Sequence, residues 1–337
     1  MLKFYKLMFF LTLITGTLIA ISSYSWMSMW IGLEINLLSI IPLMSDQKNL
    51  YPSESALKYF ITQVLASAIL LFSIISSFNL KEFMTPNPNY LMLMIMNSAL
   101  LTKLGAAPFH AWFPEVMEGL SWMNCVIMLT WQKLAPMVLL MYNSKMIMFF
   151  TSVILFSSMI SSILGLNQIS LRKIMTYSSI NHIGWMLGSM MNSQSIWFIY
   201  FLIYSLITIN IILVLKLHHI FYLKQLFSSI NLNKNLKFFF ILNFLSLGGL
   251  PPFLGFFPKW LTISNLVQNN FLVISIILIL FTLITLFFYL RITFSTMVIN
   301  SKEMIIEPEN PNMFKIMFFN LLTLTGLATC TFIFNMS

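Results

Sequence analysis

Long apolar runs fill this chain almost from end to end. A run of about 20 apolar residues crosses about 30 Å of hydrocarbon as an α-helix, and roughly eleven such runs occur here. They lie near residues 7–23, 26–45, 58–79, 91–113, 119–142, 146–166, 172–192, 195–216, 237–265, 271–293 and 315–334. The segments between them are too short to fold a soluble core. We therefore expect an all-α, polytopic membrane protein of about 11 transmembrane helices, with its function inside the bilayer.

Few features of the sequence favour a redox or metal site. Only 8% of the residues are charged, against roughly 25% in soluble domains. Cys125 and Cys330 both fall in apolar runs, which argues against a disulfide, a thiolate metal site or an iron–sulfur cluster. No haem, flavin or nucleotide fingerprint occurs. The first apolar run leads directly into the second without a small-residue cleavage site, so we expect a retained helix. We expect no cofactor and no metal in this chain.

The basic residues predict an orientation, because Lys and Arg resist translocation across the membrane. With the N-terminus inside, only Lys81 and Lys145 flank outer helix ends. The inner ends carry Lys3, Lys6, Lys48, Lys58, Arg172, Lys173, Lys216, Lys224, Lys234, Lys237, Arg291, Lys302 and Lys315. This bias places the N-terminus inside and the C-terminus outside. The formal charge of +9 then reflects topology and surface anchoring, and it gives no support to nucleic-acid binding.

Four charged residues lie inside the apolar runs and need another explanation: Glu34, Lys103, Lys133 and Lys259. A charge near the centre of a membrane helix costs about 2.5 to 3.5 kcal/mol on insertion scales. At 1.5 Å per residue, Glu34 lies roughly 12 Å and Lys103 roughly 20 Å below the outer ends of their helices, and Lys133 lies about 20 Å above the inner end of its own. The charges either pair to hold helices together or form a proton path.

A proton path requires groups that can take up and release protons. Burial favours a neutral amine, whereas a nearby carboxylate favours the ammonium, so a buried lysine can load or release a proton as its partner moves. His182 lies near mid-span beside Asn181 and extends the same chemistry, although helix packing explains it equally well. His218 and His219 fall at an inner helix end, where we expect an interfacial role.

An internal repeat interrupts two of the runs. Residues 103–115, KLGAAPFHAWFPE, and 247–259, LGGLPPFLGFFPK, share the pattern GxxPFxxxFP[EK] at a constant offset. Under the predicted topology the two copies run in opposite directions. Paired Gly/Pro-interrupted helices of opposite orientation indicate a transporter core, because freed backbone groups are tolerated only inside protein or beside water. We therefore predict one antiporter-like transmembrane domain over residues 1–337.

The two copies of the repeat differ in their charges. Lys259 stands where the first copy has Glu115. Inversion places Lys259 toward the outer face, where it is either a proton relay or an anchor. Glu115 and Glu118 we assign to the inner surface.

Four motifs carry a family resemblance: HAWFPEVMEGL, TWQKLAP, SSINHIGW and GGLPPFLGFFPKW. In this order they resemble the subunit 2 family of mitochondrial NADH:ubiquinone oxidoreductase, respiratory complex I, over essentially the whole chain. More distantly they resemble cation/proton antiporter subunits. The resemblance implies a membrane-arm subunit of the H⁺-translocating NADH:ubiquinone reductase, EC 7.1.1.2, in the mitochondrial inner membrane. Members of this family usually have fourteen helices, and animal versions of the subunit lack the first three, which fits the eleven runs.

The same resemblance implies cofactors and partners outside this chain. NADH, FMN, iron–sulfur clusters and ubiquinone would be bound by other subunits, whose electron transfer drives proton movement here. The partners would be antiporter-like and small membrane-arm subunits, together with phospholipids. A standalone cation/proton antiporter and a structural spacer subunit remain alternatives.

The family's functional residues fall on the charges singled out above. The family's glutamate in its fifth helix falls on Glu34, and its lysine before the broken seventh helix falls on Lys103. Its central lysine falls on Lys133, and its ionisable residue in the twelfth helix falls on Lys259. Its polar axis would pass near His182. We expect a change in neighbouring subunits to alter the Glu34–Lys103 pairing and hence the proton affinity of Lys133, with protons leaving past Lys259. Further polar residues could hold water or simply pack: Gln132, Thr102, Asn97, Asn181 and Asn210.

Overall fold

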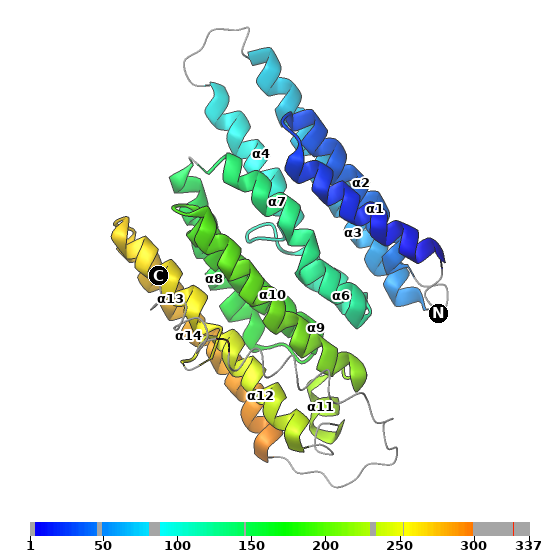
Figure 1. Ribbon diagram of the computed structural model, residues 1–337, viewed down its shortest axis with the longest axis vertical. Coiled ribbons are helices and arrows are strands. Elements are labelled where there is room, and N and C mark those ends of the chain that lie inside the picture. Colours follow the sequence, from blue (N-terminus) through cyan, green and yellow to red (C-terminus); the bar gives the residue numbers. More distant parts are fainter. Residues whose placement is uncertain are drawn as a thin grey trace. The chain divides into compact units, whose positions relative to one another are not determined.

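The computed structural model describes residues 4–45, 49–80, 88–144, 146–229, 234–251, 253–298 and 326, and this part of the chain is helical (Figure 1). The helices are α1 (Phe4–Ser22), α2 (Trp26–Met44), α3 (Leu50–Leu80), α4 (Pro88–Leu104), α5 (Trp112–Gly119), α6 (Trp122–Leu129), α7 (Trp131–Tyr142), α8 (Ile147–Leu166), α9 (Leu171–Met190), α10 (Gln194–Leu217), α11 (Leu223–Ser229), α12 (Lys234–Gly248), α13 (Phe256–Gln268) and α14 (Leu272–Val298). An isolated β-bridge joins Ser170 and Tyr222. The all-α prediction is confirmed.

Membrane-spanning character is confirmed for most of the predicted runs. Seven stretches of the described residues are long and apolar enough to cross a membrane. They are α1, α2, α3 to Phe78, α6 with α7, α8, α10 and α14. Two shorter apolar helices, Tyr90–Leu104 and Leu236–Gly248, precede the interruptions of the repeat. The run at 315–334 lies outside the described residues apart from residue 326, so the polytopic class is confirmed and the number eleven remains a prediction.

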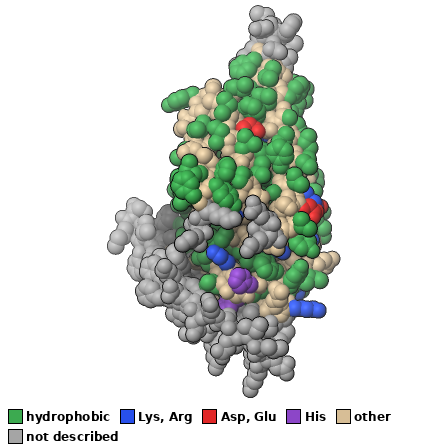
Figure 2. All heavy atoms as spheres, turned by 90° about the vertical axis from the view of Figure 1, so that its right-hand side faces the viewer, with side chains coloured by type: hydrophobic (Ala, Val, Ile, Leu, Met, Phe, Trp, Pro, Cys, Tyr) green, Lys and Arg blue, Asp and Glu red, His purple; other side chains and the backbone are tan. Residues whose placement is uncertain are grey.

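The chain divides into two compact units, Met1–Val153 and Ile154–Ser337. In the first unit α1 packs on α2, and α3 packs on α2, α4 and α5. Helix α7 packs on α4, α6 and α1. Large apolar side chains of α1 and α3 are exposed, and hydrophobic side chains dominate the face in Figure 2. Such a surface is suited to hydrocarbon rather than to water.

In the second unit α9 is the enclosed helix. It packs on α10, α13 and α14, while α12 packs on α10 and α14. Every residue of α9 from Ile174 to Met190 is buried, including its serines and His182. A helix that is buried on all sides belongs to the interior of a bundle. The polar residues of α9 therefore face protein, not lipid.

Both copies of the repeat are broken helices, and they break at equivalent residues. Helix α4 ends at Leu104 and α5 begins at Trp112, while α12 ends at Gly248 and α13 begins at Phe256. The glycine after each first half has a left-handed backbone, with φ of 73° at Gly105 and 76° at Gly249. This conformation is open to glycine at no steric cost. The glycine of the repeated motif is therefore explained by how the helix ends.

The hydrogen bonds at the two breaks also match. The amide of Gly105 donates to the Thr102 carbonyl at 3.2 Å, and that of Ala106 donates to the Leu101 carbonyl at 3.1 Å. In the second copy, the amide of Gly249 donates to Ser246 at 3.0 Å and that of Leu250 donates to Leu245 at 3.4 Å. This pair of bonds is the Schellman motif that closes a helix C-terminus. The shared sequence pattern thus encodes a shared local structure.

The span predicted near 119–142 is present as Trp122–Tyr142. Its helix is interrupted at Thr130, between α6 and α7, where the backbone has φ −115° and ψ −71°. Pro136 adds to the irregularity, because proline cannot donate to the carbonyl four residues earlier, that of Gln132. The stretch TWQKLAP therefore begins at a helix interruption.

Candidate functional site

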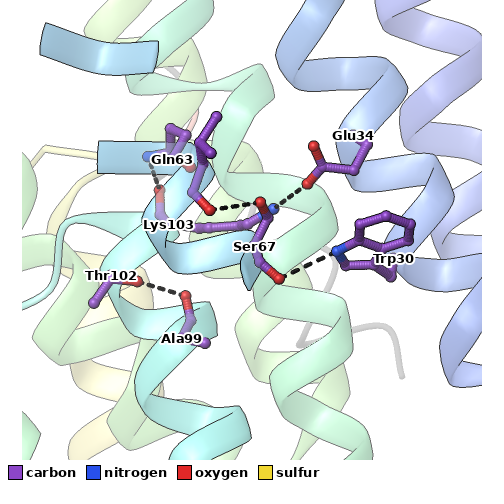
Figure 3. Close-up of polar contacts among 8 residues, drawn as sticks. Trp30, Glu34, Gln63, Ser67, Ala99, Thr102 and Lys103 are labelled. Carbon is purple, nitrogen blue, oxygen red and sulfur yellow. Dashed lines mark hydrogen bonds and ion pairs between the residues drawn. The ribbon is translucent and has the colours of Figure 1, made fainter. Parts of the chain in front are cut away.

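Glu34 and Lys103 form an ion pair inside the first unit. Glu34 lies on α2 and Lys103 in the last turn of α4, and the lysine Nζ is 3.5 Å from the glutamate Oε1 (Figure 3). The Lys103 side chain is 5% exposed and that of Glu34 is 23% exposed. The end of α4 favours a cation, because the carbonyls of a last helical turn carry partial negative charge. The predicted pairing of these two residues is present.

Side chains from other helices satisfy carbonyls at the first break. The Gln63 side-chain amide of α3 donates to the Lys103 carbonyl at 3.4 Å, and the Trp112 indole donates to the Thr102 carbonyl at 3.0 Å. Buried backbone groups away from water need such partners. The break beside Lys103 is thereby stabilised without a regular helix.

Lys133 lies close to this pair. It is 2% exposed, on the first turn of α7. Lys103 and Lys133 line the same small cavity together with Tyr59 and Gln132. A second cavity is also lined by Lys103, Tyr59 and Gln132. The two cavities thus place both amines and their polar neighbours along one internal space of the first unit.

Of the polar residues expected to hold water near Lys133, Gln132 fits that role, whereas Thr102 and Asn97 do not. The Gln132 side-chain amide donates to Asn36 Oδ1 at 2.7 Å and Gln132 lines both cavities, as a water-holding residue would. The Thr102 hydroxyl donates to the Ala99 carbonyl at 2.7 Å, and the Asn97 amide donates to the Met146 sulfur at 3.5 Å. Thr102 and Asn97 therefore have contacts typical of packing. Sequence reasoning did not single out Tyr59 or Gln63.

Lys259 occupies the second break. It lies on α13, 7% exposed, and its Nζ donates to the carbonyls of Gly248 at 2.8 Å and Leu247 at 3.3 Å. These are the last carbonyls of α12, so the ammonium caps that helix. The Trp185 ring of α9 lies 5.9 Å from Nζ, within cation–π range. The Leu247 carbonyl of the second copy aligns with the Lys103 carbonyl of the first copy. The Leu247 carbonyl accepts a hydrogen bond from the Lys259 ammonium, whereas the Lys103 carbonyl accepts one from the neutral Gln63 amide.

His182 belongs to a polar cluster in the second unit. Its Nδ1 is hydrogen-bonded to the Tyr200 hydroxyl at 2.8 Å, and its ring centroid is 5.0 Å from that of Tyr204. A small cavity is lined by these three residues and by Ser246, Leu247, Gly255 and Pro258. Asn181 donates to Thr285 Oγ1 at 3.2 Å, and Asn210 is buried. The sequence carried a signal for the tyrosines, since Tyr200 and Tyr204 are one turn apart in an apolar helix.

Glu115 lies in a surface cluster instead of the buried site. It is 3.4 Å from Lys58, which is also 3.1 Å from Glu54, and the three side chains are 45% to 64% exposed. Exposed ion pairs of this kind stabilise a fold by little. Within the described residues no three His, Cys, Asp or Glu side chains form a group that could hold a metal ion, and the predicted span around Cys330 lies outside that part of the chain.

Comparisons with known proteins agree with this arrangement. Residues 23–285 match the family model described as NADH:quinone oxidoreductase/Mrp antiporter, transmembrane. NADH-ubiquinone oxidoreductase chain 2 of Anopheles gambiae is 50% identical over 97% of each chain. The protein of the same name from Locusta migratoria is 46% identical over 88% of this chain and 87% of the other.

Solved structures share the fold. A chain of respiratory complex I from Thermus thermophilus superposes with a TM-score of 0.87 at 24% identity, covering 96% of this chain and 78% of that one. A chain of the Mrp complex from Dietzia gives 0.76 at 15% identity, covering 89% and 62%. The broken helices, the buried charges and the family match lead to one conclusion: the chain belongs to the NADH:quinone oxidoreductase/Mrp antiporter transmembrane family.

Proposed function

We propose that this chain is a core membrane-arm subunit of proton-pumping NADH:ubiquinone oxidoreductase and conducts protons across the inner membrane. It is a multi-pass inner-membrane protein, and we assign it to the mitochondrion. The names of its relatives, at 50% identity over 97% of the chain, support the assignment to the complex. One observation carries proton conduction: Lys103, which is paired with Glu34, lines one internal cavity together with Lys133.

The redox chemistry takes place in other subunits of the complex. NADH, FMN, the iron–sulfur clusters and ubiquinone are bound there, and this chain contributes to NADH:ubiquinone reductase as its proton-conducting part. Its partners are other membrane-arm subunits, in keeping with its structural neighbours, which come from respiratory membrane complexes. Phospholipids cover its exposed apolar surface.

The domain organisation and orientation are part of the same proposal. Residues 1–337 form a single antiporter-like domain in which the two broken helices are inverted repeats, and their matching Schellman ends support a common origin. The N-terminus lies in the matrix and the C-terminus in the intermembrane space. The distribution of Lys and Arg in the sequence supports that orientation.

The first half of the mechanism is an exchange of partners around Lys103. A charge pair about 3.5 Å apart attracts by about 5 kcal/mol at an effective dielectric constant of about 20. While Glu34 holds the Lys103 ammonium, little of that charge acts on Lys133. When Glu34 withdraws, two amines beside one cavity repel each other's protons, and Lys133 releases its own. A movement of α2 relative to α4, driven by a neighbouring subunit, would therefore change the proton affinity of Lys133.

The second half of the mechanism uses the other unit. Protons released from Lys133 leave past His182 and Lys259. Lys259 is held at the break by two carbonyls and can return to them after each transfer, because a helix end attracts its charged form. The buried polar cluster around His182 supports this role.

The experiment that tests this function replaces Lys133 by Met in the assembled complex. We expect normal assembly on native gels, and loss of most proton translocation per electron in proteoliposomes. Lys224→Met is the matched control, because it removes an exposed lysine by the same substitution. Normal proton translocation in the Lys133→Met complex would contradict the proposal and favour the spacer alternative.

A second measurement separates this function from that of a standalone antiporter. The family includes Mrp antiporter subunits, so ion exchange by the isolated chain is a specific alternative. The purified chain would be reconstituted alone in liposomes with an imposed Na⁺ or pH gradient. We expect no coupled exchange, since the driving force comes from redox subunits. Robust cation/proton exchange by the chain alone would overturn the assignment.

A further inference from the structure

A short hydrogen bond joins α2 to α7 at the cavity that Lys103 also lines. The Gln132 side-chain amide donates to Asn36 Oδ1 at 2.7 Å, at the short end of the normal range for an N–H···O bond. Asn36 is 3% exposed, and the two residues are 96 positions apart in the sequence. Both carboxamides are neutral, so their bond does not depend on the protonation states of the amines around it.

The place of Asn36 on α2 connects this bond to the ion pair. Glu34 and Asn36 are two residues apart, so about 200° separates their side chains around the helix axis. Glu34 reaches Lys103 on α4, whereas Asn36 reaches Gln132 on α7. One helix therefore holds both contacts, on different sides. A displacement of α2 relative to α4 and α7 acts on the two contacts together.

The turn that carries Gln132 has weakened backbone support. It begins at Thr130, between α6 and α7, and the Lys133 amide donates to the Thr130 carbonyl, three residues back, at 3.2 Å. Bonds of this type have poorer geometry than those of an α-helix. Further along, Pro136 has no amide proton to donate to the Gln132 carbonyl. A side-chain bond from this turn to another helix therefore fixes its position more than it would in a regular helix.

Helix α2 gives the turn a firm point of attachment. Helix α7 packs on α4, α6 and α1, and the Gln132–Asn36 bond adds a direct link to α2. A β-carbon at Gly16 of α1 would lie 2.9 Å from the Asn36 amide nitrogen, and one at Gly32 of α2 would lie 2.6 Å from the Ala20 amide nitrogen. Helices in such close contact cannot slide past each other freely. Helices α1 and α2 thus form a rigid pair, to which Gln132 attaches the first turn of α7.

We propose that Gln132 is a positioning residue for Lys133, an inference that rests on the proposed function. Through Asn36, it ties the turn that carries Lys133 to α2, the helix that carries Glu34. A shift of about 0.5 Å stretches the 2.7 Å bond to the limit of the normal range, so the turn follows any larger movement of α2 or loses the bond. Lys133 then changes its place at the cavity that it shares with Lys103. Opening of the ion pair and displacement of Lys133 become one event.

Replacing both carboxamides by apolar side chains of similar size tests the proposal. This variant, the apolar pair, combines Asn36→Leu with Gln132→Met. It leaves neither partner of the bond unpaired, and such a double replacement can leave stability nearly unchanged. In the assembled complex we expect parental assembly on native gels and parental resistance to heat inactivation. Proton translocation per electron should fall about 2- to 10-fold, the range that corresponds to one neutral hydrogen bond. Gln194→Met is the matched control, because it removes an exposed glutamine by the same substitution.

Two further variants separate positioning from other roles of the same side chains. Asn36→Leu alone leaves Gln132 in place, so a loss of translocation there assigns the effect to the bond and not to water that Gln132 holds. The exchanged pair, Asn36→Gln with Gln132→Asn, keeps the combined length of the two side chains and restores the bond. It should retain at least about half of parental translocation, because residues in contact act together and not additively. The exchanged pair also decides the question if the apolar pair does not assemble.

The outcomes also separate this inference from the function on which it rests. Parental translocation in Asn36→Leu or in the apolar pair would overturn the positioning role. An exchanged pair that translocated no better than the apolar pair would overturn it as well. If Lys133→Met still abolished translocation in the same preparation, the proposed function would stand without the positioning role. Normal translocation in Lys133→Met would remove both.

Discussion

Gly249→Ala is the substitution whose effect the structure defines most closely. Gly249 ends α12 with φ of 76°, and a β-carbon at this position would lie 2.7 Å from Cδ and 2.9 Å from Nζ of Lys259. Heavy atoms in contact normally lie about 3.5 to 4 Å apart. The new methyl group therefore strains the backbone and displaces the Lys259 ammonium from the end of α12.

The size of the effect has two parts. A residue with a β-carbon in the left-handed region costs roughly 1 to 2 kcal/mol. Hydrogen bonds to charged groups contribute about 1.5 to 3 kcal/mol, and displacement of Nζ weakens the 2.8 Å bond to the Gly248 carbonyl. Since the lysine stem is flexible and retains part of that bond, we expect a total of about 2 to 4 kcal/mol.

The assay compares two neighbouring glycines in the assembled complex. Gly248→Ala adds the same methyl group inside the helix, where its nearest neighbour would be Leu286 Cδ1 at 3.5 Å, an ordinary contact. We expect Gly249→Ala to inactivate at least about tenfold faster on heating than Gly248→Ala, because about 1.4 kcal/mol corresponds to a tenfold change in rate. Proton translocation per electron should also fall only in Gly249→Ala.

A single result would refute this reasoning. If Gly249→Ala and Gly248→Ala were equal in both heat inactivation and proton translocation, the left-handed glycine and the lysine cap could not be coupled as described. Equal heat inactivation with a selective loss of translocation would show that the methyl group moves Lys259 without weakening the helix end.

Two other predictions concern the ion pairs of the first unit. Lys103→Met removes the cation beside the mostly buried Glu34 carboxylate and leaves that charge unpaired, so we expect poor assembly on native gels. Adding Glu34→Gln to the same chain should restore assembly, because it removes the unpaired charge. Failure of Glu34→Gln to restore assembly would contradict this explanation. Lys58→Met breaks the exposed contacts with Glu54 and Glu115. It should change the rate of heat inactivation by less than about fivefold, which corresponds to less than about 1 kcal/mol. A larger loss of stability would give this cluster a role that its exposure does not suggest.

The sequence was sufficient for the helical class and for the two breaks, because both follow from local rules. Apolar length predicts a span, and Gly with Pro at fixed spacing predicts an interrupted one. The ends of α4 and α12, at Leu104 and Gly248, fall where the repeat places them. The interruption at Thr130 has no glycine and no adjacent proline, so nothing in the local sequence marked it.

The partners of the buried charges were harder to predict, because they come from distant parts of the chain. The depth of the buried charges indicated that Glu34 needed a lysine partner, either Lys103 or Lys133, and the structure pairs it with Lys103. The carbonyl acceptors of Lys259 could not be anticipated, since they depend on how α13 folds back against the end of α12. Likewise, Tyr200 could be linked to His182 only once the packing of α9 on α10 was known.

The enclosure of α9 from Ile174 to Met190 has a consequence for biogenesis. A nascent segment enters the lipid phase on its own only if its side chains gain from leaving water. Segment 171–190 carries three serines, Asn181, His182 and two basic residues, so it gains little. Segment 171–190 would therefore be retained at the translocation machinery until α10, α13 and α14 have been synthesised to surround it. Late, cooperative insertion of this helix would make translation through residue 298 a precondition for integrating the second unit.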